Sequence, residues 1–238
     1  MGTHAQKRLI RKLDLERFLS TIPVNLTPKA NLEQYTTSEH IAATMLYIAA
    51  YTNNDIVGKH VLDLGCGTGR LSLGAAFLGA DNVLGVDIDR DTLKTAATNA
   101  QNTGFASNTS WINGDISIIK GGQCFDTVLQ NPPFGVQTRN ADRVFLVKAL
   151  ESGKMIYSLH NHPMVDKRLI SMLKSSSKNS GGLFEIQPSP FLKKFIEQHG
   201  GVIRTVYATL MTIPKMFDFH TKLHHDFVID LYIIEGSN

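Results

Sequence analysis

Cysteine is scarce in this 238-residue sequence, which contains Cys66 and Cys124 and no others. Two cysteines do not hold a fold of this size together, so a reducing cytoplasm is expected rather than a disulfide scaffold. Long apolar runs are also missing, because no stretch approaches the ~20 residues of a membrane helix. Residues 1–12 carry charges without an apolar core or a small-residue cleavage site, so no signal peptide is expected. These absences favour a cytoplasmic globular protein without membrane spans.

A strong net charge is missing as well, but the charges are unevenly distributed. The formal net charge is +3. Residues 1–30 carry +4 and residues 139–178 carry +5, whereas residues 31–138 carry −5 and residues 179–238 carry −1. Two basic stretches on either side of an acidic middle indicate a polyanionic partner. Two solvated helical faces would give the same pattern, so charge alone leaves both interpretations open.

The sequence does contain a regular alternation of short apolar strands and helices. Strands are expected at residues 60–64, 83–86, 109–112, 125–129 and 155–158. Helices are expected at residues 6–21, 38–51, 70–78, 91–102 and 142–151. This alternation predicts an α/β fold built from βαβ units, with a mostly parallel sheet and helices on both faces.

The C-terminal part has a different pattern. A helix is expected at residues 191–199, and two long β-rich runs follow at 202–213 and 227–234. No helix separates these two runs, so they are expected to pair antiparallel. Residues 174–183 (KSSSKNSGGL) have the composition of a loop. We therefore expect one domain over residues 1–238, with residues 1–30 as an N-terminal helical extension and 160–190 as a flexible or inserted segment.

A glycine-rich turn follows the first predicted strand. Its sequence is Asp63-Leu-Gly65-Cys-Gly67-Thr-Gly, and it opens the helix at residues 70–78. Glycines let the backbone turn tightly and approach a ligand closely. Asp87 ends the next strand, where a carboxylate can accept hydrogen bonds from ribose hydroxyls. Arg70 occupies the position at which a dinucleotide-binding motif has its third glycine, so the turn departs from that motif. No Lys-Ser/Thr pair follows the glycines, which excludes a P-loop.

A second motif, Asn131-Pro132-Pro133-Phe134, follows the fourth predicted strand. Loops at the carboxyl ends of strands border the ligand crevice of an open α/β sheet. The Asn131 side chain and the Pro132 carbonyl together can accept both hydrogens of an –NH₂ group, and the prolines make the loop rigid. Phe134 can stack on a planar substrate. These residues favour a reaction that transfers a group to an amine or amide nitrogen. Catalysis would come from positioning the reactants.

The Asp63–Gly69 turn, with Val86-Asp87-Ile88-Asp89 after it, resembles the Rossmann-like S-adenosylmethionine-dependent methyltransferases. The resemblance implies a seven-stranded sheet whose last strand is antiparallel. It also implies that the glycine turn, with Asp63, contacts the methionine and ribose parts of S-adenosyl-L-methionine. By the same resemblance Asp87 holds the ribose, Asp115 meets the adenine amine, and Ile116 lies beside the adenine ring.

The Asn-Pro-Pro-Phe segment is similar to that of methyltransferases acting on adenine N6, guanine N2 or protein glutamine. Four further segments resemble the methyltransferase-like-five family, and these are residues 32–37 (LEQYTT), 125–128 (FDTV), 156–160 (IYSLH) and 217–220 (FDFH). The resemblance implies methylation of adenine N6 in small-subunit ribosomal RNA. It implies cofactor contacts at Gln34, Thr37, Gly65, Thr68 and Arg70. One departure is Thr36, which stands where the family has a proline.

The resemblance also implies two partners. One is a structured RNA, whose phosphates would meet cations of the basic stretches, namely Lys7, Arg8, Arg11, Lys12, Arg139, Arg143, Lys148, Lys167 and Arg168. The other is a small zinc-binding activator protein that adds to a sheet edge, for which the strand at residues 109–112 is the candidate.

Two alternative functions stay open. One is a protein-glutamine N5-methyltransferase, and the other is a non-catalytic RNA-binding factor of ribosome assembly. No metal site is expected, because His160, His162, His220, His224 and His225 have the pattern of solvent-exposed loop residues. Trp111 is expected in the core or at an interface.

Overall fold

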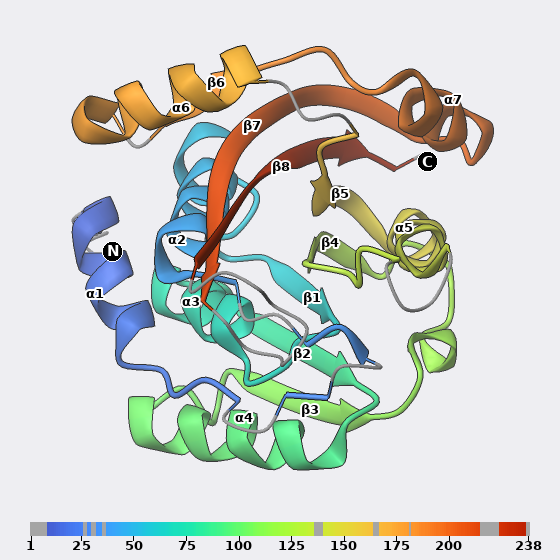
Figure 1. Ribbon diagram of the computed structural model, residues 1–238. Coiled ribbons are helices and arrows are strands. Elements are labelled where there is room, and N and C mark those ends of the chain that lie inside the picture. The colour runs from blue at the N-terminus through green and yellow to red at the C-terminus, as the bar shows by residue number, and fades with distance from the viewer. Residues whose placement is uncertain are drawn as a thin grey trace, which may run out of the picture.

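The computed structural model describes residues 9–25, 28–29, 32–34, 37–135, 140–163, 167–180, 182–214 and 224–236. In these residues eight strands form one sheet in the order β3-β2-β1-β4-β5-β8-β7-β6 (Figure 1). The strands are β1 (His60–Leu64), β2 (Asn82–Asp87), β3 (Thr109–Asn113), β4 (Phe125–Gln130), β5 (Gly153–Asn161), β6 (Leu183–Glu185), β7 (Val202–Pro214) and β8 (His224–Glu235). Strands β1 to β5 pair in parallel, and β8 is antiparallel to both β5 and β7. The predicted mostly parallel sheet with an antiparallel last strand is confirmed.

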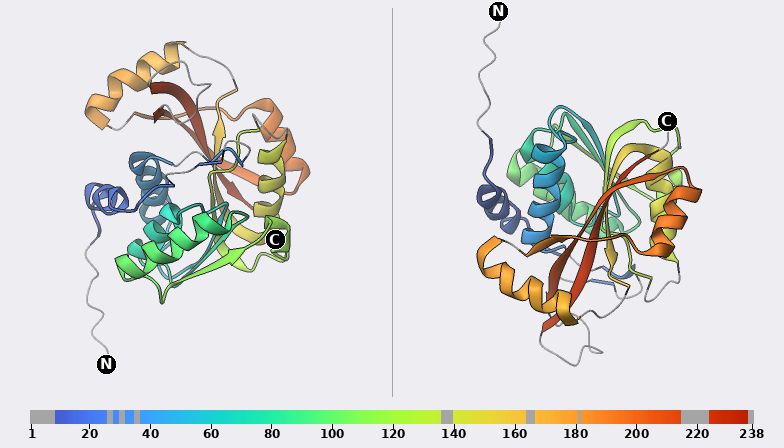
Figure 2. Two further views of the ribbon diagram at one scale, coloured as in Figure 1. Left: turned by 60° about the horizontal axis from the view of Figure 1, so that its bottom comes forward. Right: turned by 90° about the horizontal axis from the view of Figure 1, so that it is seen from above.

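Helices cover both faces of this sheet. They are α1 (Lys12–Ser20), α2 (Glu39–Tyr47), α3 (Arg70–Leu78), α4 (Arg90–Thr103), α5 (Ala141–Ser152), α6 (Lys167–Ser180) and α7 (Pro190–Gln198), with a π-helical turn η2 (Ile48–Thr52) and a 3₁₀ turn η3 (Ile116–Ile118). Helices α1 to α4 lie on one face, and α5 and α7 lie on the other (Figure 2). No helix of the described residues is long and apolar enough to cross a membrane.

The core has two main parts because side chains alternate between the two faces of each strand. On the first face, Leu19 of α1 and Leu46 of α2 belong to a buried cluster that also contains Ile229 of β8. On the second face, Leu146 of α5 and Ile196 of α7 belong to a cluster that includes other residues of β1, β4 and β8. Burial on both faces explains why the strands read as short apolar runs.

The segment between β5 and α7 differs from its prediction. Its composition predicts a loop at residues 174–183, whereas the structure continues α6 to Ser180 and adds β6 antiparallel to β7 as an eighth strand. Leu173 is fully buried against Ala208 and Val228, so tertiary packing outweighs the low helix propensity of the serines. Three residues are too few for a period-two pattern to reveal β6.

Strand β3 is at one end of the sheet, and Trp111 anchors it. The indole packs over Gly69 and Gly85, where a Cβ atom would lie 2.6 Å from the ring at either position. Trp111 is partly buried and packs against the first core cluster, in agreement with the prediction that it lies in the core or at an interface. The outward side of β3 includes Ile112, which is 37% exposed.

Candidate functional site

A cavity of about 410 Å³ opens at the carboxyl ends of the parallel strands. Its volume is in the range of small-molecule sites, ~300–1,000 Å³. The predicted site residues that line it are Gln34, Thr37, Asp63, Gly65, Gly67, Thr68, Arg70, Asp87, Asp115, Ile116, Asn131 and Pro133. The fold thus brings the glycine turn, the acidic strand ends and the Asn131 loop together around one space.

The glycine turn forms an open cradle in this cavity. Gly67 has φ +56°, and a Cβ atom there would meet nothing within 4 Å. Its amide donates to Oδ2 of Asp87 at 2.8 Å, while the amide of Asp89 donates to Oδ1 at 2.8 Å. Two backbone donors therefore fix the plane of the Asp87 carboxylate. Burial raises the pKa of Asp87 from its ordinary value, and the two amide donors oppose that shift.

Asp63 is the more deeply buried acid of the cavity. Its Oδ2 accepts from the amide of Ser72 at 3.0 Å and from the Ser72 hydroxyl at 2.6 Å. Burial raises the pKa of Asp63 to about 7, although the two Ser72 hydrogen bonds lower it. Asp63 therefore titrates near neutral pH, next to a space in which a cation would stabilise its charged form.

Residues between α1 and α2 cross the cavity and are fastened to Asp89. The Gln34 side-chain nitrogen donates to Oδ2 of Asp89 at 2.8 Å, and Nζ of Lys29 donates to Oδ1 at 2.8 Å. The Gln34 side-chain oxygen accepts from the Lys29 amide at 2.8 Å and from Asn25 at 3.0 Å. Gln34 lines the cavity, as predicted, but its polar atoms bind protein. We call these described residues (21–25, 28–29, 32–34 and 37–38) the strap.

Arg70 holds both ends of the strap, which its motif position alone did not indicate. Its guanidinium donates to the carbonyl of Thr37 at 2.7 Å and to that of Ile22 at 3.2 Å. The Thr37 hydroxyl in turn accepts from the side-chain nitrogen of Asn131 at 2.9 Å. Thr37 thereby connects the strap to the Asn-Pro-Pro-Phe loop.

Asn131 presents a vacant acceptor. Its Oδ1 is buried and has no hydrogen-bond partner in the described part of the chain. Leaving a buried acceptor unpaired costs ~1–3 kcal/mol, so a donor from a ligand is the natural complement. Because Nδ2 is held by Thr37, the amide is oriented with its oxygen free.

Of the remaining motif residues, one lines the cavity and two do not. Pro132 is buried and Pro133 lines the cavity. Phe134 packs edge-on against Phe227 of β8, with ring centroids 6.0 Å apart and an interplanar angle of 79°. The structure therefore does not place Phe134 or Pro132 on the cavity wall, and their roles toward a substrate stay predictions.

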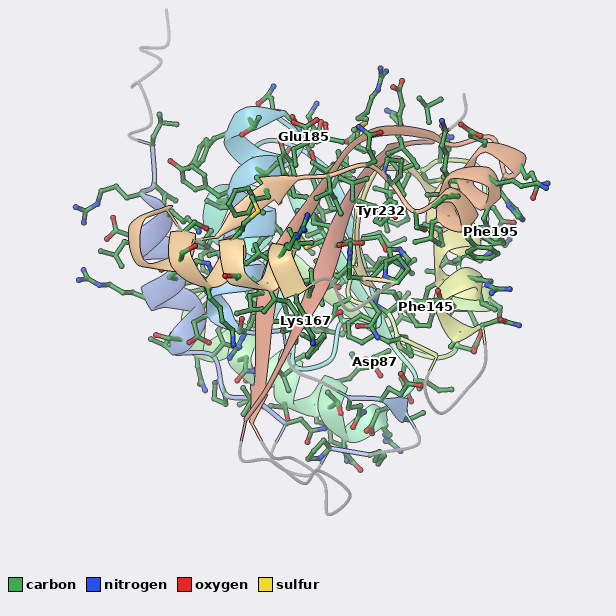
Figure 3. The ribbon with its side chains drawn as sticks, turned by 45° about the horizontal axis from the view of Figure 1, so that its top comes forward. Asp87, Phe145, Lys167, Glu185, Phe195 and Tyr232 are labelled. Atoms are coloured by element: carbon green, nitrogen blue, oxygen red, sulfur yellow. The ribbon has the colours of Figure 1, made fainter. Side chains whose placement is uncertain are left out.

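Several lining residues were not among the predicted site residues, although Leu32, Glu33, Cys66 and Ile88 lie within motifs quoted above. They are Asn25, Leu32, Glu33, Cys66, Leu71, Ile88, Thr92, Gly114, Ala141 and Phe145. Ile88 directly follows Asp87 and is 56% exposed. Its position next to a predicted site acid could have identified it as a lining residue from the sequence. Phe145 on α5 packs within 3.0 Å of the Cβ position that Gly65 lacks, so the glycine is explained by a contact 80 residues away. Figure 3 shows Phe145 and Asp87 on different elements of this region.

Among the described residues, the predicted RNA-binding cations of α1 and α5 do not form one surface. Helix α1 lies on one face of the sheet and α5 on the other (Figure 1), so the two basic stretches are separated. Three of the cations have acidic neighbours, in the pairs Arg11–Asp14, Lys12–Glu16 and Lys148–Glu151. Lys7, Arg8 and Arg139 lie outside the described residues. Lys167 and Arg168 begin α6.

The prediction that His160 is a solvent-exposed loop residue is wrong. Strand β5 extends to Asn161, and His160 is 3% exposed, with Nε2 2.8 Å from the Ser158 hydroxyl. His162 is paired with the buried carboxylate of Asp230 at 2.9 Å. His220 and the side chains of His224 and His225 lie outside the described part of the structure.

Comparisons with known proteins agree with this geometry. A family model described as a methyltransferase domain matches residues 56–200. The rRNA N(6)-adenosine-methyltransferase METTL5 of Danio rerio is 41% identical over 151 residues, covering 62% of this chain and 72% of that protein. The chain belongs to the methyltransferase-like-five (METTL5) family. Its reaction class is methyl transfer, and the cofactor of this family is S-adenosyl-L-methionine.

Two archaeal relatives match almost the whole chain. An uncharacterized protein of Methanocaldococcus jannaschii, MJ0284, is 34% identical and covers 95% of this chain and 95% of its own length. The crystal structure of PH1948 from Pyrococcus horikoshii, a candidate RNA methyltransferase, superposes with a TM-score of 0.77 at 33% identity, covering 97% of this chain and 100% of that one.

The residues present fit S-adenosyl-L-methionine. The cradle at Gly67 leaves room for a ligand atom, and the oriented carboxylate of Asp87 offers acceptor lone pairs to hydroxyl groups. Asp63 and Asp87 provide negative charge for a cationic cofactor. Ile116 is buried at the wall and Ile88 is exposed beside it, so the two give apolar surface for a planar ring.

Proposed function

We propose that this protein methylates adenine N6 in structured RNA, with small-subunit ribosomal RNA as the substrate. The observation that carries the proposal is the vacant Oδ1 of Asn131 beside a cofactor-type cavity. The name of the METTL5 relative, an rRNA N(6)-adenosine-methyltransferase, supports adenine and ribosomal RNA. A ribosomal-RNA substrate favours a cytoplasmic location.

The proposed chemistry needs positioning rather than a strong base. When bound, S-adenosyl-L-methionine supplies a methyl group activated by a sulfonium charge. The lone pair of an adenine amine is delocalised into the ring, so the amine is a poor nucleophile. Oδ1 of Asn131 would accept one N–H, and the Pro132 carbonyl would accept the other, which favours rehybridisation and directs the lone pair. Phe134 would stack on a base flipped out of its helix.

The other predicted residues would hold the cofactor. Asp87 would bind the ribose, Asp115 and Ile116 would border the adenine, and Asp63 with Gly65, Gly67 and Thr68 would contact the amino-acid part. Gln34, Thr37 and Arg70 would act by holding the strap over it. Asp115 already accepts from the amide of Ser117 at 2.8 Å, so its carboxylate is fixed in direction.

We also propose a partner at the free side of β3. This strand is the end of the sheet in the described residues, so one side of its backbone is available for pairing. Ile112 and Ile118 near it are 37% and 48% exposed. These features fit strand addition by the small zinc-binding activator protein that the family resemblance implies. Co-expression followed by co-purification tests it, and fully active protein that never retains the activator contradicts it.

One experiment separates the candidate functions. Purified protein is incubated with methyl-labelled S-adenosyl-L-methionine and either ribosomal RNA or total protein from cells lacking the enzyme, with Asn131→Ala as the matched inactive variant. Label in RNA as N6-methyladenine, lost in Asn131→Ala, supports the proposal. Label in protein instead supports glutamine methylation, and RNA binding without label supports a non-catalytic assembly factor.

A further inference from the structure

A large aromatic ring is exposed at the start of α7. Phe191 is 52% exposed and is the second residue of α7. The guanidinium carbon of Arg143 lies 4.4 Å from the centroid of the Phe191 ring, which is a cation–π contact. Phe195 stacks on Phe191 with centroids 6.2 Å apart and an interplanar angle of 24°. The ring is therefore held in place by an arginine and a second ring while part of it stays open to solvent.

This pair lies at the edge of the sheet where the cavity opens. Strands β5 and β7 run in the same direction, because β8 is antiparallel to both. Helices α5 and α7 precede these strands, so each helix starts near the carboxyl ends of the parallel strands and runs back. In Figure 3, Phe145 and Phe195 mark α5 and α7, which lie on the same flank of the molecule.

Helix α5 lies between the exposed pair and the cavity. Ala141 and Phe145 line the cavity, and Arg143 is two residues from each of them. Residues two apart point to opposite sides of a helix, so α5 faces the cofactor space on one side and carries the cation over Phe191 on the other. The pair is therefore outside the cavity, across α5 from it.

Exposed cations accompany this pair. Lys193 and Lys194 follow Phe191 on α7. The acids nearby are Asp142, next to Arg143, and Glu185 and Glu197, which border the same pocket as Lys193. Three of the cations expected to meet phosphates are paired with acids, whereas Arg143 lies over an aromatic ring.

We propose that Phe191 and Arg143 form a stacking platform for the RNA nucleotide that neighbours the methylated adenine. This inference rests on the proposed function. Removing a base from its stack leaves its neighbour without a stacking partner, and an exposed aromatic face with an arginine replaces that partner in many single-strand sites. A single exposed ring is too small for a stable protein interface, which needs more than ~1,000 Å². A nucleobase needs one ring.

Three substitutions of Phe191 test the platform. Phe191→Ala removes the ring, Phe191→Leu keeps apolar packing on Phe195 without an aromatic face, and Phe191→Tyr keeps the face. We expect Phe191→Ala and Phe191→Leu to weaken binding of a fluorescein-labelled single-stranded RNA with one central adenine by about tenfold. The KM for ribosomal RNA should rise similarly while kcat and cofactor affinity stay close to wild type. Phe191→Tyr should bind like the wild type.

Arg143→Ala tests the cationic half of the platform. It should weaken RNA binding and reduce the dependence of affinity on salt by about one counterion. Two matched controls lie at the opposite edge of the sheet. Val202→Ala at the start of β7 removes an apolar side chain that is 54% exposed and matches the Phe191 variants. Lys154→Ala at the start of β5 removes a cation and matches Arg143→Ala. Both should bind RNA like the wild type.

The outcomes separate this inference from the proposed function. If the wild type methylates RNA and the Phe191→Ala and Phe191→Leu variants bind it equally well, the platform is refuted and the function stands. If the wild type methylates no RNA, the function fails, and the binding titration still decides the platform. Loss of a co-purifying protein from Phe191→Leu with unchanged RNA affinity would overturn the platform in favour of a protein contact.

Discussion

The side-chain nitrogen of Asn131 donates to the hydroxyl of Thr37 at 2.9 Å, and this bond fixes the rotation of an amide whose Oδ1 has no hydrogen-bond partner in the described residues. Thr37→Val removes the acceptor, so the Asn131 amide gains freedom to rotate and its oxygen is lost from the site part of the time. One such hydrogen bond is worth ~0.5–1.5 kcal/mol, which corresponds to a decrease in kcat of about tenfold at most. Single-turnover methylation at saturating cofactor measures it.

Thr37→Ser is the matched control for this prediction, because serine keeps the hydroxyl and loses a methyl group. It should restore most of the rate. Equal rates for Thr37→Val and the wild type would show that Asn131 is oriented by something else.

Cofactor affinity should depend on the proton of Asp63. Burial raises the pKa of Asp63 to about 7, so near pH 6 the free protein holds a proton there. A cationic cofactor favours the ionised carboxylate, so binding releases this proton and affinity rises with pH. Between pH 6 and pH 8 the increase should reach about tenfold at most. Calorimetric titration of S-adenosyl-L-methionine at several pH values measures it.

Asp63→Asn isolates this effect, since the amino group of the cofactor titrates in the same range in both proteins. Cofactor affinity should rise more steeply with pH in the wild type than in Asp63→Asn. Equal slopes in the two proteins would mean that Asp63 is already ionised in the free protein. The same shift affects folding. The folded pKa is raised, so the contribution of Asp63 to stability is full below pH ~4 and is lost as the pH rises through 7.

Gly85→Ala should destabilise the protein through Trp111. The new Cβ atom would lie 2.6 Å from the indole and 2.9 Å from Sγ of Cys66. Overpacking of this kind costs ~1–3 kcal/mol. Urea unfolding monitored by far-ultraviolet circular dichroism measures the loss, because this signal is kept when Trp111 is replaced. Trp111→Phe in the Gly85→Ala background should recover part of the stability, and Ser110→Ala on the exposed side of β3 should change it little.

Gln34 distinguishes fastening of the strap from direct cofactor contact. Gln34→Ala and Asp89→Ala each remove the 2.8 Å hydrogen bond between these side chains, so each should weaken cofactor binding about tenfold by loosening the strap. The loss in the double variant should be smaller than the sum of the two single losses, because both changes break the Gln34–Asp89 hydrogen bond, while Asp89 also accepts from Lys29 and from the Asp91 amide. Additive losses in the calorimetric Kd would instead indicate that Gln34 contacts the cofactor independently.

The sequence predicts the sheet well where local signals and tertiary structure agree. The strand at residues 60–64 and the helix at 70–78 match the structure because the glycines at 65, 67 and 69 allow the positive φ angles that the turn between them requires. Helix α6 is missed because its serines carry no helical signal of their own, and the burial of Leu173 that stabilises it depends on β7 and β8.

The sequence predicts those residues of the candidate site that belong to its motifs. Asp87 and Asn131 follow strands, so their place at the carboxyl edge is readable from the sequence. Phe145 is not readable, since it reaches the cavity by packing on Gly65 across 80 positions of chain. The role of Arg70 in holding the strap is not predictable from the sequence either. Its partners are the backbone carbonyls of Ile22 and Thr37, and every residue has such a carbonyl.

A buried polar chain beneath the Asn131 loop should make stability depend on pH through His160. The Gln130 side chain donates to the Ser158 hydroxyl at 2.8 Å, and this hydroxyl lies 2.8 Å from Nε2 of His160. Burial lowers the pKa of His160 to about 4. The unfolded chain takes up its proton near pH 6.5, so this group destabilises the fold progressively as the pH falls from 6.5 toward 4, by roughly 3 kcal/mol.

His160→Gln keeps this series of hydrogen bonds and removes its titratable group. The glutamine side chain can bond to the Ser158 hydroxyl in place of Nε2, and glutamine does not titrate. The buried Asp63 shifts stability in the opposite direction over the same pH range, so the informative quantity is the difference between variant and wild type in the free energy of unfolding. That difference should change in favour of His160→Gln by roughly 3 kcal/mol between pH 7 and pH 4. His160→Phe removes the acceptor and should also slow methyl transfer, because Gln130 directly precedes Asn131. A pH-independent difference for His160→Gln would mean that His160 takes up its proton as readily in the folded protein as in the unfolded chain.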